Sequence, residues 1–138
     1  MRLIGFSLNK INVEKSLKKV EGLTINTKID ISSIEEAKSD FFKFKEEAIA
    51  IGFSFLVIYE PEFAKIDLAG NVLLAVESKI SKEVLKQWKE KKIPEEFKIM
   101  LFNLILKKST LKALQLEEEL NLPLHIPLPS FKKQEKED

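Results

Sequence analysis

Three consecutive glutamates and a single histidine come closest to a catalytic or metal-binding pattern in this chain: Glu117, Glu118, Glu119 and His125. Consecutive residues of a helix point about 100° apart, so the triplet predicts a solvated helix face rather than two acids that act together. A histidine without a second nitrogen or sulfur ligand makes a poor metal site. We therefore expect His125 to have a structural or surface role.

No motif for nucleotide or metal chemistry accompanies these residues, since the sequence has no GxxxxGK, no GxGxxG and no HExxH. The acidic pairs at 46–47 and 95–96 lack a nucleophile or partner base, and the absence of cysteine excludes thiolate chemistry and disulfides. The net charge is +1, and the lysine pairs are separated by acids rather than gathered on one basic face. The sequence predicts no enzyme, no cofactor or metal, and no nucleic-acid partner.

The sequence also lacks the features of an exported or membrane-spanning protein. Residues 1–10, MRLIGFSLNK, contain no long apolar region with a small-residue cleavage site, and no run of about 18 apolar residues occurs. We expect a cytoplasmic protein without membrane insertion. Lysine and glutamate are abundant and Arg2 is the only arginine, a composition typical of thermophiles but explained equally well by coding bias.

The elements that would position a site divide the chain into two halves. In the first half, apolar and polar residues alternate, which predicts four strands around residues 4–9, 23–31, 49–59 and 64–74. Residues 59–62 contain a proline suited to a turn between the last two strands, and Gly70 is a candidate bulge position. Phe41, Phe42 and Phe44 interrupt the alternation, as either a bulge at a strand start or an exposed binding patch.

The second half has helical periodicity. Ser81 is the expected cap of a helix that runs to Lys92 and places Val84, Leu85 and Trp88 on one side. A second helix is expected from Pro94 to Leu120, and residues 97–106 are apolar almost all round it. One sheet can cover only one side of such a helix, so we expect a partner subunit on the other. The predicted oligomer interface consists of Ile99, Phe102, Ile105 and Leu106.

Residues 121–131, NLPLHIPLPSF, form an apolar segment stiffened by three prolines. Leu122, Leu124, Ile126 and Leu128 are two residues apart, so an extended chain places all four on one side, and we expect them to dock on the helix or the sheet edge. Residues 132–138 are charged and are expected to be a disordered tail. The chain is thus predicted to form one domain over residues 1–131.

Four strands followed by two helices without helical crossovers predict an α+β fold, an antiparallel sheet with both helices on one face. The order resembles the SecB family of protein-export chaperones. The likeness is carried by residues 63–75, FAKIDLAGNVLLA, similar to the family's fourth strand, by residues 99–106, IMLFNLIL, at the start of its long helix, and by the proline segment 121–131. The resemblance implies a dimer of dimers that binds client proteins, more strongly than it implies export.

From this resemblance we expect a non-enzymatic holdase whose client-binding residues are Ile66, Leu68, Trp88, Leu124 and Ile126. Trp88 is interpreted either as a groove residue or as an anchor of its helix on the sheet. Phe53 and Phe55 would be core if the long helix covers their face, and groove if it does not. Two other functions stay open: a structural subunit of one fixed complex, and a lipid- or small-ligand-binding protein.

Overall fold

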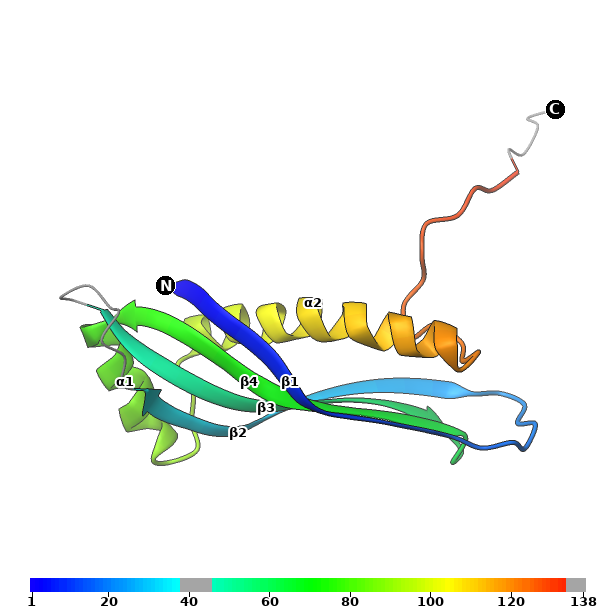
Figure 1. Cartoon of the computed structure of the whole chain (residues 1–138), viewed down its shortest axis with the longest axis horizontal. Helices are drawn as coiled ribbons and strands as arrows, with labels where there is room; N and C mark the ends of the chain where they lie inside the picture. The colour runs from blue at the N-terminus through cyan, green and yellow to red at the C-terminus, as the bar shows by residue number, and fades with distance from the viewer. Residues whose placement is uncertain (38–45, 134–138) are drawn as a thin grey trace.

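The computed structural model describes residues 1–37 and 46–133, and contains a four-stranded antiparallel sheet followed by two helices (Figure 1). The elements are β1 (Arg2–Lys15), β2 (Thr24–Ala37), β3 (Glu46–Glu60), β4 (Ala64–Glu77), α1 (Ser78–Trp88) and α2 (Glu95–Glu119). The strand order in the sheet is β1-β4-β3-β2. The predicted α+β architecture is confirmed. Phe41, Phe42 and Phe44 lie outside the described residues.

The core lies between one face of the sheet and the two helices. β3 and β4 contribute the alternating residues that the sequence predicts, and the following are 2% exposed or less: Ile49, Ile51, Phe53, Phe55, Val57, Tyr59, Ile66, Leu68, Val72 and Leu74. Val76, beyond the predicted range, is fully buried as well. Val84 of α1 and Phe97, Leu101 and Ile105 of α2 cover one half of this face. Ala113 and Leu116 of α2, with Leu122, cover the other half. Phe53 and Phe55 are therefore core residues.

β1 and β2 extend well beyond the predicted ranges because bulges interrupt their alternation. The pairing shifts register between Leu8 and Lys10 in β1 and between Ile31 and Ser33 in β2, so the residues that follow exchange faces. Gly70 lies opposite Leu8, and a Cβ at Gly70 would collide with the backbone of Ser7. The extra residue of the bulge thus lies in β1, and Gly70 permits the close approach of the two strands.

The helix boundaries differ from the prediction mainly at α1. This helix begins at Ser78 rather than at Ser81, and Ser81 lies one turn inside it, buried on the sheet-facing side together with Val84. α1 ends at Trp88 rather than at Lys92, because the chain closes it with a Schellman motif. The Lys91 N–H donates to Trp88 O at 2.8 Å and the Lys92 N–H to Gln87 O at 3.0 Å. α2 matches its predicted range closely.

A second motif of the same kind ends α2 and starts the proline segment. Asn121 has a φ of 53°, and the Leu122 N–H donates to Glu117 O at 2.8 Å. Leu122 is buried, and the Tyr59 hydroxyl donates to Pro123 O at 2.6 Å. Burial and then the charge of Glu117 raise the pKa of Tyr59, so its hydroxyl stays a donor. The first residues of the segment are thus fixed to β3.

Glu117 and His125 form a buried pair that holds this segment to the helix. Their side chains are 0% and 2% exposed, and His125 Nδ1 lies 2.7 Å from Glu117 Oε2. The His125 backbone N–H also donates to Glu117 Oε1 at 3.0 Å. The predicted solvated face is therefore wrong for Glu117 and holds for its exposed neighbours Glu118 and Glu119. His125 has the structural role that was one of its two expected roles.

Only the first part of the proline segment docks. Leu122 is buried and Leu124 is half-buried, but Ile126 is exposed, Leu128 is 54% exposed and Phe131 is fully exposed. The chain bends at His125 and Ile126, and the residues that follow project away from the sheet and helices (Figure 1). The expectation that all four alternating aliphatic residues dock is wrong, because the bond to Glu117 turns the chain outward.

Replacing Glu117 by alanine is expected to lower the free energy of unfolding by about 2–5 kcal/mol, because it leaves the His125 backbone N–H and ring nitrogen buried without their hydrogen-bond partner. Glu118→Ala, one residue further along the same helix, is the matched control and should change it by no more than about 0.5 kcal/mol. Urea unfolding of both variants provides the measurement. Equal midpoints for the two variants would contradict the pair's structural role.

Two truncations test how much of the proline segment stabilises the domain. A chain ending at Asn121 loses Leu122, the Pro123 acceptor and His125, and its melting temperature should fall clearly, since burying one aliphatic side chain contributes roughly 1.5–3 kcal/mol. A chain ending at Ile126 loses, within the described part of the chain, only the exposed residues 127–133 and should melt close to the full chain. If both truncations melt alike in a thermal scan, the docking seen here does not contribute to stability.

Candidate functional site

A groove opens where α1, the loop after it and the start of α2 meet β2. It consists of two adjoining hollows of about 680 Å³ and 530 Å³ that share Ile93, Lys98 and Phe102. We call it the Trp88 groove. Its further lining residues are Ile29, Asp30, Ile31, Gln87, Trp88, Lys91, Lys92, Glu95, Ile99 and Asn103.

The floor of the groove is apolar and continuous with the core. Ile29, Ile31, Trp88, Ile93 and Phe102 are each half-buried and contact the buried residues beneath α1 and the first half of α2. Trp88 is thus both an anchor of α1 on the core and a groove residue, so the two interpretations of this residue are compatible. The floor offers aliphatic and aromatic surface that a bound chain can cover.

The loop that ends α1 sets the position of the groove's first cation. Lys91 has a φ of 58°, a left-handed conformation in which glycine is the usual residue. Its Nζ lies 4.5 Å from the centroid of the Trp88 ring, close enough for a cation–π contact. The Schellman motif therefore places an ammonium group directly above the main aromatic residue of the floor.

α2 provides a second cation in the same manner. Lys98 and Phe102 are four residues apart, which brings them to the same side of the helix. Lys98 Nζ lies 5.5 Å from the centroid of the Phe102 ring. In the part of the chain that the structure describes, no carboxylate lies within 4 Å of Lys91 or Lys98.

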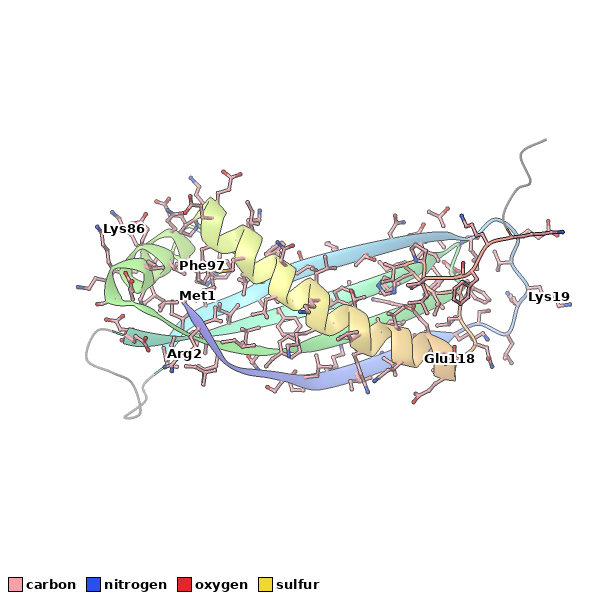
Figure 2. All side chains as sticks on the ribbon, turned by 90° about the horizontal axis from the view of Figure 1, so that it is seen from above. Met1, Arg2, Lys19, Lys86, Phe97 and Glu118 are labelled. Atoms are coloured by element: carbon pink, nitrogen blue, oxygen red, sulfur yellow. The ribbon has the colours of Figure 1, made fainter. Side chains whose placement is uncertain are left out.

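The predicted client-binding residues do not form one surface in this structure. Ile66 and Leu68 are fully buried beneath the second half of α2, where they contact no solvent. Leu124 and Ile126 lie on the proline segment that follows α2. Figure 2 shows α2 crossing the sheet diagonally, with Phe97 near one end and Glu118 near the other, so Trp88 and the proline segment lie at opposite ends. Of the five residues, only Trp88 lines the groove.

The four predicted interface residues do not lie on one surface either. Ile105 is fully buried in the core and Phe102 is half-buried in the Trp88 groove, whereas Ile99 is 57% and Leu106 is 42% exposed. Met100 and Leu111 add exposed apolar surface to α2 that the prediction left out. In the described residues, neither helix is long and apolar enough to cross a bilayer.

A second, more apolar hollow of about 570 Å³ lies between the two helices near the N-terminus. Met1, Ile80, Val84, Pro94, Phe97 and Met100 line it, with Lys79, Glu83 and Glu96 at its rim. In Figure 2 Met1 lies beside Phe97. Sequence reasoning missed this hollow because Met1 and Ile80 meet α2 only through the sheet's tertiary arrangement.

The two cations of the Trp88 groove, Lys91 and Lys98, were also not predicted from the sequence. The spacing of Lys98 and Phe102 along a predicted helix was visible in the sequence and would have placed the ammonium group near the ring. The position of Lys91 had no such signal, because its left-handed backbone follows only from the way α1 ends.

Comparison with known proteins identifies the fold. No protein-family model matches the sequence, and a search of curated proteins gives no significant match. A solved structure, the SecB-like chaperone Rv1957 of Mycobacterium tuberculosis in complex with a ChAD peptide from the HigA1 antitoxin, superposes with a TM-score of 0.53. The match covers 94% of this chain and 89% of that one, at 12% identity. The chain therefore has a SecB-like α+β fold.

Proposed function

We propose that this protein is a non-enzymatic chaperone that holds unfolded or partner polypeptides on the Trp88 groove. The observation that carries the proposal is the groove itself, an open apolar floor of half-buried aliphatic and aromatic residues. Unfolded chains expose apolar side chains, and such a floor covers them by area with little dependence on sequence. The SecB-like fold, found in a chaperone that was solved with a bound peptide, supports the same function.

The proposal includes self-association through the outer side of α2. Ile99 and Leu106 are exposed on one flank of that side, and Met100 and Leu111 on the other. Exposed apolar side chains that gather on a helix are commonly covered by a neighbour. The same surface favours the second candidate function, a structural subunit that one fixed partner covers permanently.

Trp88→Ala is expected to weaken the binding of a denatured client by about 30-fold, because aromatic contacts at binding hot spots commonly contribute about 2 kcal/mol. Calorimetric titration with several unrelated denatured proteins measures the affinity, and light scattering measures the suppression of their aggregation. In the wild type, Trp88 fluorescence should shift when a client is added.

Leu85→Ala is the control for the Trp88 substitution. Leu85 is half-buried on the same helix and contacts the same core residues, but it does not line the groove. It should lower the melting temperature without weakening client binding. A wild-type protein that suppresses the aggregation of no client would refute the chaperone proposal and favour the fixed subunit.

Leu106→Asp is expected to produce a smaller species in solution, because a buried unpaired carboxylate at an interface costs several kcal/mol. Gln115→Asp places the same charge on an exposed site of α2 outside the apolar stretch and should leave the mass unchanged. Light scattering coupled to size-exclusion chromatography measures the mass. A wild-type chain that is monomeric at micromolar concentration would refute self-association.

A further inference from the structure

The charges around the Trp88 groove are unevenly paired. Asp30 lies 3.6 Å from the Lys28 ammonium, and Lys92 lies 4.0 Å from Glu90. Glu95 lines the adjoining hollow. Lys91 and Lys98 have no carboxylate within 4 Å in the described ranges 1–37 and 46–133, and they stand over the two aromatic rings of the floor. Among the described residues, two cations without a carboxylate within 4 Å therefore border an apolar floor.

The backbone at Lys91 indicates that one of these cations is specifically placed. A side chain with a Cβ is disfavoured in the left-handed region, where glycine has no such penalty. The conformation is required by the end of α1, yet the residue that adopts it is a lysine whose ammonium lies 4.5 Å from the Trp88 ring centroid.

These observations define the chemistry of a preferred partner, given the chaperone function proposed above. We infer that the Trp88 groove prefers extended segments in which acidic residues stand beside large apolar ones. The apolar residues would cover Trp88, Phe102 and Ile93, and the carboxylates would pair with the Lys91 and Lys98 ammonium groups. Segments with lysine in place of the acids would meet like charge at the same two points.

The preference is local, since the whole chain carries a net charge of only +1. Long-range steering of acidic partners therefore contributes little. The selectivity has to come from contacts at the groove, which makes it sensitive to substitution of single lysines. The selectivity should also decrease as salt is added, because exposed charges are screened over about 8 Å at 0.15 M ionic strength.

The test uses three short synthetic peptides with the same alternating leucine and phenylalanine residues, separated by glutamate, glutamine or lysine. Trp88 fluorescence reports their binding to the full chain. The glutamate peptide is expected to bind about three- to tenfold more tightly than the glutamine peptide at low salt, the gain of one or two exposed ion pairs. The lysine peptide should bind more weakly than both, and added salt should reduce the differences.

Lys91→Gly is the decisive variant. Glycine suits the left-handed backbone, so the variant should fold at least as stably as the wild type, and any lost selectivity cannot be attributed to misfolding. Lys91→Gly combined with Lys98→Gln should bring the affinities of the glutamate and glutamine peptides within about twofold of each other. Lys86→Gln removes an exposed lysine of α1 that does not line the groove, and should leave the preference intact.

The outcomes separate this inference from the function on which it rests. Equal affinities for the three peptides on the wild type would overturn the acidic preference while supporting an apolar groove. A glutamate preference that survives in the double variant would also overturn it, since other residues would then account for the selectivity. Binding of none of the three peptides would refute the proposed function itself.

Discussion

One helix has to cover a sheet that is too large for it, and the rest of the structure follows from this constraint. Four strands spaced about 4.8 Å apart make a sheet roughly 15–20 Å wide, whereas a helix is about 10 Å across. α2 has 25 residues and is therefore about 37 Å long, while β3 has 15 residues and extends about 50 Å. α1 fills one end of the core face and the proline segment fills the other. Strips of apolar surface beside α2 remain only partly covered, and the Trp88 groove is one of them.

The way α2 crosses the sheet explains the residues it buries. Phe97, Leu101, Ile105, Ser109, Ala113 and Glu117 are all buried, and each follows the previous one by four residues. Because a turn has 3.6 residues, such a row winds slowly around the helix, which agrees with the diagonal path of α2 in Figure 2. The row also becomes smaller after Ile105, at Ser109 and Ala113, and Ala113 lies in the same buried cluster as the large side chains of Phe55 and Tyr59. Glu117 is the last member of this row and is buried for that reason.

The sequence was sufficient for the elements whose signal is local. β3 and β4 pair without a register shift, so their alternation is unbroken and their inward residues could be predicted correctly. β1 and β2 contain bulges, which no periodicity rule locates, and their ranges were underestimated. Comparison with Glu118 and Glu119 wrongly suggested that Glu117 is exposed. Its position twenty residues after Phe97, along the row of buried residues four apart, would have indicated that it is buried. Ile66 and Leu68 were assigned to a groove from the resemblance to the SecB family, and sequence periodicity could not correct this, because it identifies the apolar face of a strand but not what covers it.

The Trp88 groove exists because the helices cover the sheet incompletely, and this origin determines how the groove can recognise a bound chain. Its floor consists of core residues that reach the surface, so its affinity comes mainly from apolar area, which discriminates little between sequences. Its cations come from the ends of helices: Lys91 from the motif that closes α1, and Lys98 from the first turn of α2. An exposed ion pair contributes about 0.2–1 kcal/mol, whereas one buried aliphatic side chain contributes roughly 1.5–3 kcal/mol. The charges can therefore rank partners but cannot replace the apolar contacts, and a groove of this kind combines broad binding with a modest preference.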